Sequence, residues 1–146
     1  MPLRAFALFL LGLCFCAQVQ ADEGFSGSYR LDCSTIQSEP SAVKWLKTEC
    51  ERRKDAPTLR IEPGEVSGSW IVTELGASED GRTESLTWRQ SAVDGMECVS
   101  APFVAICKAP TNKAVFGQLV GDGVRSNTGL LLVGQGLIAD VIKVNK

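Results

Sequence analysis

Apolar residues follow two different patterns, one before residue 57 and one after it. Within residues 41–54, Val43, Leu46 and Cys50 recur at helical spacing and therefore share one face. The pattern predicts one helix over this segment. Trp45 lies off the apolar face, so we expect its side chain to be partly exposed.

Beyond Pro57 the chain consists of short runs of β-branched and aromatic residues, separated by turn residues about every 8 to 12 positions. This spacing is typical of antiparallel sheets whose strands follow one another in sequence. One further short strand is expected before the helix. The expected strands are residues 28–31, 59–61, 69–75 and 83–90, two strands flanking a turn at Ala101-Pro102, and residues 114–120, 130–133 and 137–144.

The expected fold class is mainly β: an antiparallel meander of about eight strands forming a small barrel or a sandwich, with one N-terminal helix and two disulfides. The chain has no internal repeat and no low-complexity linker, so residues 22–146 are expected to form a single β-rich domain. Residues 130–133 and 137–139 have no polar face, which predicts burial on both sides or a covering by the helix. Trp70 and Trp88 are expected in the core, and a ligand cavity lined by them is the alternative.

Residues 1–21 have the pattern of a secretory signal peptide. Arg4 gives a positive start, residues 6–15 form an apolar run, and small residues precede a cleavage position after Ala21. The run is too short to span a bilayer, and no later stretch approaches about 18 apolar residues, so no integral membrane segment is expected. We expect a periplasmic protein, with an extracellular one as the alternative. The absence of an Asn-x-Ser/Thr sequon favours the periplasm.

Two of the six cysteines lie within the expected signal peptide, which leaves four. In an oxidising compartment, four cysteines predict a disulfide framework with three possible connectivities. We expect Cys33 to bond Cys50 and Cys98 to bond Cys107, since the turn at Ala101-Pro102 would place Cys98 opposite Cys107 in a hairpin. Neither spacing is Cys-x-x-Cys, which argues against a redox pair.

The composition removes several classes of chemistry. Histidine is absent, which excludes the commonest general base, the Ser-His-Asp and Cys-His nucleophile systems, and ordinary catalytic zinc sites. Carboxylates cluster only at a terminus, on the helix end and in turns, so an enzyme that uses carboxylates alone is the least favoured class. We expect no catalytic residue, no metal and no cofactor. Without Arg4, 14 basic and 17 acidic residues give a net charge of −3, which argues against a nucleic-acid partner.

These exclusions favour recognition over catalysis. We expect a secreted or periplasmic non-catalytic binding protein, an inhibitor or immunity-type protein that blocks an envelope-acting enzyme or toxin. Its partner would be a protein such as a secreted hydrolase or toxin. Candidate protein-binding residues are Trp45, as an exposed anchor, and Glu79, Asp80 and Arg82, in a turn whose charges could meet a basic cleft. The alternative is a carrier of a small hydrophobic ligand in a lipocalin-like barrel.

Overall fold

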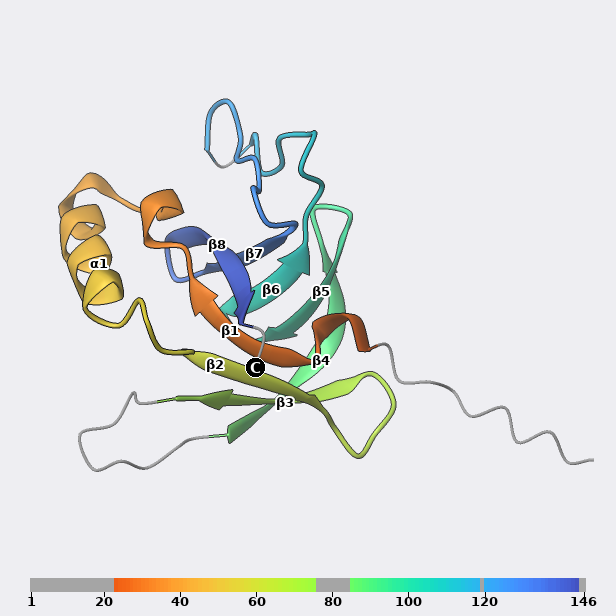
Figure 1. Cartoon of the computed structure of the whole chain (residues 1–146). Coiled ribbons are helices and arrows are strands. Elements are labelled where there is room, and N and C mark those ends of the chain that lie inside the picture. Colours follow the sequence, from red (N-terminus) through yellow and green to blue (C-terminus); the bar gives the residue numbers. More distant parts are fainter. Residues whose placement is uncertain (1–22, 76–84, 119, 145–146) are drawn as a thin grey trace, which may run out of the picture.

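The strands form a closed barrel in which neighbours in sequence are neighbours in space (Figure 1). The computed structural model describes residues 23–75, 85–118 and 120–144. The strands are β1 (Gly27–Leu31), β2 (Leu59–Pro63), β3 (Ser69–Glu74), β4 (Ser85–Val93), β5 (Met96–Ala101), β6 (Val104–Lys108), β7 (Leu130–Gly134) and β8 (Leu137–Val144). Each strand pairs antiparallel with the next, and β8 closes the barrel against β1, with Leu31 opposite Val141. The expected meander is confirmed, and it closes as a barrel, not as a sandwich.

Alternate positions along the strands fill the barrel interior. Tyr29, Ile61, Val99, Ile106 and Val141 have no exposed surface and belong to one apolar cluster. Burying a side chain of this size contributes about 1.5 to 3 kcal/mol. These five residues come from five different strands, so the same cluster holds the barrel wall together.

One end of the barrel is closed by a short 3-10 helix, η1 (Glu23–Phe25). Phe25 is buried, and its ring meets that of Trp70 edge to face with 5.8 Å between the ring centroids. The hydroxyl of Tyr29 donates a hydrogen bond to the backbone oxygen of Phe25 at 2.7 Å. The ammonium of Lys108 lies 4.8 Å from the centroid of the Phe25 ring. The Phe25 side chain therefore fills this end of the barrel interior.

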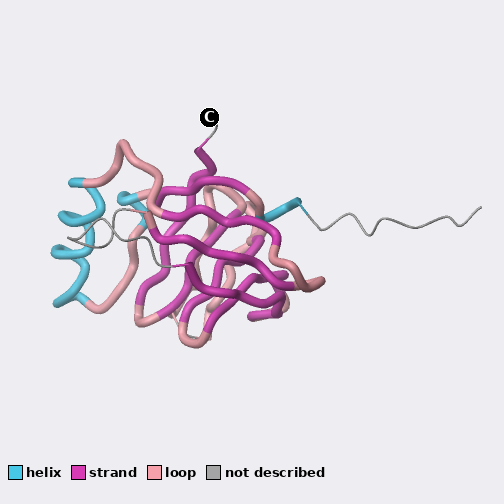
Figure 2. The backbone as a smooth tube through the Cα atoms, turned by 90° about the horizontal axis from the view of Figure 1, so that it is seen from below, coloured by secondary structure: helices cyan, strands magenta, loops and turns pink. Residues whose placement is uncertain are grey.

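The opposite end carries the helix α1 (Pro40–Arg52) and the short 3-10 helix η2 (Cys33–Thr35), as Figure 2 shows. The predicted helix is confirmed, although it ends two residues before Lys54. Its predicted apolar face is half-buried, and no residue of α1 is fully buried. Packing alone therefore holds α1 only loosely to the barrel. No helix in the described residues has the length and apolar character needed to cross a membrane.

Both predicted disulfides are present. Cys33 in η2 is bonded to Cys50 in α1, with 5.6 Å between their Cα atoms. Cys98 on β5 lies directly opposite Cys107 on β6, and these two residues are also bonded. The first disulfide ties α1 to the segment that follows β1, and the second joins two neighbouring strands.

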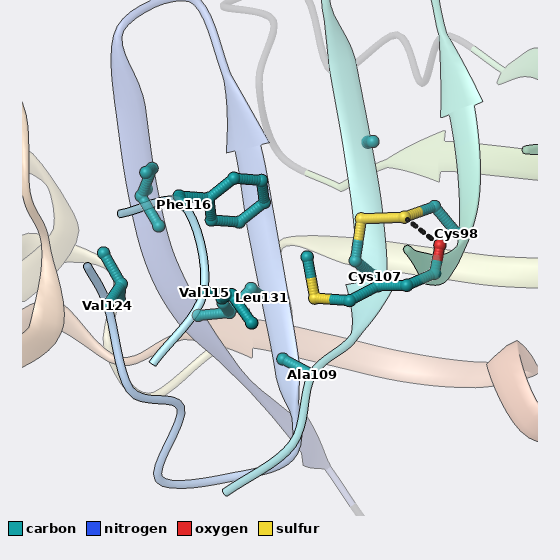
Figure 3. Packing of buried hydrophobic residues seen from close by; sticks show 10 residues of the cluster. Cys98, Cys107, Ala109, Val115, Phe116, Val124 and Leu131 are labelled. Carbon is teal, nitrogen blue, oxygen red and sulfur yellow. Dashed lines mark hydrogen bonds between the residues drawn. A yellow bond between two sulfur atoms is a disulfide. The ribbon is translucent and has the colours of Figure 1, made fainter. Parts of the chain in front are cut away.

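A second apolar cluster lies on the outside of the barrel wall, beneath the connection between β6 and β7 (Figure 3). The connection contributes Val115, Phe116 and Val124, and the wall contributes Leu131 together with the β5–β6 disulfide. The apolar run at residues 130–133 is thereby packed on both sides, inside the barrel and outside it. The outer cover is this connection and not the helix.

The strand expected at residues 114–120 is wrong. Among the described residues between β6 and β7, no strand forms, and Val115 makes only an isolated bridge with Val124. Phe116 has a φ of +59°, which interrupts an extended strand. The apolar residues of this segment pack flat against the barrel wall instead of alternating between two faces of a sheet.

Candidate functional site

The end of the barrel beside α1 contains a cavity of about 690 Å³. Because antiparallel strands alternate in direction, β1, β3, β5 and β7 end here, and β2, β4, β6 and β8 begin here. The helix contributes side chains to the cavity from one side. Apolar residues that line it include Leu31, Leu59, Val72, Leu86, Trp88, Val104 and Leu132 from the barrel and Ala42, Trp45 and Leu46 from α1.

The cavity occupies only the α1 end of the barrel. Toward η1 the interior is filled by buried side chains, among them Tyr29, Ile61 and Trp70, with Phe25 beyond them. No residue of η1 lines the cavity. The barrel interior is therefore filled by side chains at the η1 end and contains an apolar cavity at the α1 end.

Trp88 belongs both to the core and to the cavity wall. It lies on β4 opposite Trp70, is 4% exposed, and lines the cavity. In the described part of the chain, its indole Nε1 is buried and has no hydrogen-bond partner. Buried indole N–H groups usually find an acceptor, and an unmet buried donor costs about 1 to 3 kcal/mol. Trp88 therefore lines the cavity, but its Nε1 atom has almost no exposed surface.

Large apolar side chains are exposed around the same end of the barrel. Trp45 on α1 is 64% exposed and Leu86 on β4 is 58% exposed, and both line the cavity. Phe103 is 83% exposed and lies in the turn between β5 and β6, next to Val104 of the cavity wall. Apolar surface is thus left open to solvent beside the cavity.

The charged side chains around the cavity have both signs. Arg30, Arg53 and Lys54 are basic, whereas Glu49 and Glu74 are acidic. Opposite charges close together cancel much of each other's field. Charge therefore does not make the cavity strongly selective for anions or for cations.

One of the four predicted protein-binding residues can be placed. Trp45 is exposed, as expected, and lies at the cavity. Glu79, Asp80 and Arg82 lie outside the described residues. The structure therefore does not test whether these three residues lie near Trp45.

The sequence does not single out Leu86 and Phe103. The available signal for Leu86 is its position two residues before Trp88, which places both side chains on the inner face of one strand. Phe103 follows Pro102 in a turn and has a φ of +73°. Nothing in the local pattern indicates that both residues lie at the same end of a barrel.

Few reactive groups are available in the described residues. The four cysteines at positions 33, 50, 98 and 107 are bonded in pairs, so they supply neither a thiol nucleophile nor a metal ligand. Within the same described ranges, no group of three or more His, Cys, Asp and Glu side chains is placed to hold a metal ion.

Comparison with known proteins adds no family. No protein-family model, no curated protein and no solved structure matches the chain. The cavity and the residues around it are therefore the observations that bear on function.

Proposed function

We propose that the protein is a non-catalytic binding protein that holds a small apolar molecule in the cavity between α1 and the barrel. The observation that carries this proposal is the cavity itself, about 690 Å³ in volume and lined largely by apolar side chains. Small-molecule sites typically have volumes of about 300 to 1,000 Å³ and mostly apolar walls with few polar groups.

The exposed side chains beside the cavity supply the driving force. Leu86 and Trp45 are both more than half exposed where they line the cavity. An apolar molecule lying against them removes their surface from water, which is worth about 25 cal/mol for each Å² buried. The buried side chains that fill the barrel toward η1 limit how far such a molecule can enter the barrel.

The remaining parts of the proposal follow from the sequence. The absence of histidine and the bonding of the four cysteines support a role without catalysis. Two disulfides are compatible with an oxidising compartment, so we also propose that residues 1–21 direct export to the periplasm, with the extracellular space as the alternative.

The test uses a neutral fluorescent probe, N-phenylnaphthylamine, titrated with the purified disulfide-bonded protein. Ala42→Trp places a large side chain in the cavity, because Ala42 lines it, and should weaken probe binding about tenfold or more. Lys44→Trp is the matched control, because Lys44 is exposed on the same helix and does not line the cavity. The proposal is wrong if the probe does not bind, or if the two variants bind it equally while both remain folded.

A protein partner is the second candidate function, and the observation that favours it is the exposure of Trp45 and Phe103 at the same end of the barrel. Exposed aromatic residues are common anchors of protein interfaces. On this proposal the protein is an inhibitor or immunity-type protein, and its α1 end contacts a secreted hydrolase or toxin.

The interface proposal is tested with purified candidate hydrolases and toxins in a binding titration. Trp45→Ala and Phe103→Ala should each weaken a specific complex about tenfold or more. Val66→Ala is the control, because Val66 is also 64% exposed but lies between β2 and β3 at the other end of the barrel. A complex that is unaffected by the first two changes would exclude this surface.

A further inference from the structure

The two disulfides differ in how deeply they lie in the molecule. Cys98 and Cys107 have no exposed surface and belong to the apolar cluster outside the barrel wall (Figure 3). Cys50 on α1 is half-buried and lines the cavity, and Cys33 is 6% exposed. The Cys50 sulfur lies 4.0 Å from the backbone oxygen of Leu31, which also lines the cavity. The bond between Cys33 and Cys50 is therefore at the edge of the cavity, and the other bond is enclosed.

The elements that each disulfide joins also differ. Neither Cys33 nor Cys50 belongs to an apolar cluster of the barrel, and no residue of α1 is buried. The helix can therefore move away from the barrel without separating a pair of strands. Cys98 and Cys107 lie directly opposite each other on β5 and β6, so a reductant reaches them only when these strands part or the outer cover lifts. A segment with few buried contacts opens at a lower free-energy cost than the core.

From this contrast we propose that the disulfide between Cys33 and Cys50 is a reduction site, at which a dithiol releases the molecule held in the cavity. The inference rests on the proposed function, because it states how binding in that cavity is regulated. One wall of the cavity comes from α1, through Ala42, Trp45 and Leu46. Once the bond is open, this wall can leave the barrel, and the cavity loses the surface that encloses its ligand.

The reaction is a thiol–disulfide exchange. A thiolate of the dithiol attacks the sulfur of Cys50, forms a mixed disulfide with it and displaces the Cys33 thiolate. The second thiolate of the dithiol then attacks the mixed disulfide and frees Cys50. The protein disulfide thereby gains two electrons and two protons, and the dithiol becomes a disulfide. The protein is the substrate of this exchange and not its catalyst, because the two cysteines are 17 positions apart and form no Cys-x-x-Cys pair.

Reduction should also remove support from the helix itself. α1 has 13 residues, and isolated helices of this length are marginal in water. Without the bond to η2, the helix keeps only its half-buried apolar face as a contact with the rest of the fold. The reduced protein should therefore lose helical circular dichroism while the barrel stays folded.

Binding and reduction should oppose each other. If reduction weakens binding by a given factor, thermodynamic linkage requires the bound molecule to disfavour reduction by the same factor. For this two-electron couple, a fivefold effect corresponds to a reduction potential about 20 mV more negative when the cavity is occupied. A ligand that fills the cavity therefore protects the bond that encloses it.

The experiment equilibrates the full disulfide-bonded protein with mixtures of reduced and oxidised dithiothreitol and then blocks free thiols with N-ethylmaleimide. Peptide mass spectrometry should find Cys33 and Cys50 blocked at ratios at which Cys98 and Cys107 remain bonded. In this selectively reduced protein the affinity for N-phenylnaphthylamine should be about fivefold lower or more, and the near-ultraviolet circular dichroism of the tryptophans should remain native.

The matched control is the double change Cys33→Ser and Cys50→Ser. This variant lacks the proposed reduction site and keeps the enclosed disulfide, so its probe affinity should not respond to dithiothreitol. A second readout repeats the equilibration of the unchanged protein with saturating probe. The ratio of reduced to oxidised dithiothreitol needed to open the bond should rise about fivefold.

The outcomes separate the inference from the proposed function. If the probe binds the bonded protein and selective reduction leaves its affinity unchanged, the cavity binds apolar molecules but the inference is wrong. The inference is also wrong if Cys98 and Cys107 are reduced at the same ratio as Cys33 and Cys50, or if the barrel unfolds with the first reduction. If the probe does not bind the bonded protein, the proposed function fails, in whatever order the bonds are reduced.

Discussion

The carboxylate of Asp140 on β8 accepts a hydrogen bond from the hydroxyl of Ser126, and both residues are buried. The same carboxylate accepts a hydrogen bond from the backbone N–H of Asn127 at 2.9 Å. On the other side, the backbone N–H of Asp140 donates to the hydroxyl of Thr35 in η2 at 2.8 Å. One residue of the barrel wall therefore fixes both the end of the β6–β7 connection and the segment that leads to α1.

We predict that Asp140→Ala lowers the free energy of unfolding by about 3 kcal/mol, because it leaves the Ser126 hydroxyl and the Asn127 N–H without their acceptor. Urea denaturation followed by tryptophan fluorescence measures the change. Asp122→Ala, an exposed carboxylate in the same connection, is the control and should change stability by less than about 0.5 kcal/mol. A loss below about 1 kcal/mol for Asp140→Ala would show that water replaces these contacts.

Tyr29 should make the free energy of unfolding decrease at alkaline pH. Burial raises the pKa of its hydroxyl above the ordinary value of 10, and the nearby charge of Lys108 lowers it in part. The folded state then holds the proton more tightly than the unfolded chain. The contribution of Tyr29 to the free energy of unfolding is therefore complete below about pH 10 and is lost as the pH rises through the raised pKa.

This prediction is checked by the ultraviolet absorbance of phenolate, which reports on one residue because Tyr29 is the single tyrosine of the chain. Tyr29→Phe should remove the titration and, below pH 10, cost about 1 kcal/mol through loss of the hydrogen bond to Phe25. A titration midpoint at or below pH 10 in the folded protein would contradict the expected direction.

Gly134 marks a close approach of two turns at the α1 end. A Cβ at this position would overlap the backbone oxygen of Phe103 and would lie 2.7 Å from the Cα of Val104. Because backbone atoms cannot move aside cheaply, Gly134→Ala should destabilise the fold by about 2 kcal/mol. Gly136→Ala is the comparison: it has open space but a φ of +76°, and should cost about 1 kcal/mol. Equal losses in urea denaturation would show that β6 and β7 separate easily.

Local pattern was sufficient for much of the fold. Alternating apolar residues on the strands and the turn at Ala101-Pro102 predict the meander and place Cys98 opposite Cys107, as observed. The pairing of Cys33 with Cys50 follows similarly from the apolar face of the helix. These features depend on residues close in sequence, or on a period that each segment carries by itself.

The features that the local pattern predicted wrongly or left open depend on contacts between distant segments. Val115 and Phe116 form an apolar run that resembles a strand, and only the outer face of the barrel wall explains why they pack flat. The cavity likewise depends on how much of the barrel interior is filled. Trp88 was expected in the core, with a cavity as the alternative, and it lies in both because α1 brings too few apolar side chains to fill the space beside it.

The disulfide between the buried Cys33 and the half-buried Cys50 should matter for ligand binding as well as for stability. No residue of α1 is buried, so this bond is the main restraint that holds the cavity side of the helix near the barrel. The double change Cys33→Ser and Cys50→Ser should weaken binding of N-phenylnaphthylamine about fivefold or more, because the cavity wall is no longer held in place before binding. Circular dichroism of the barrel tryptophans should remain native. The double change Cys98→Ala and Cys107→Ala is the control, since it removes a disulfide between neighbouring strands, away from the cavity, and should lower stability without changing probe affinity in the folded protein. Unchanged probe affinity after loss of the Cys33–Cys50 bond would mean that α1 is not needed to form the cavity.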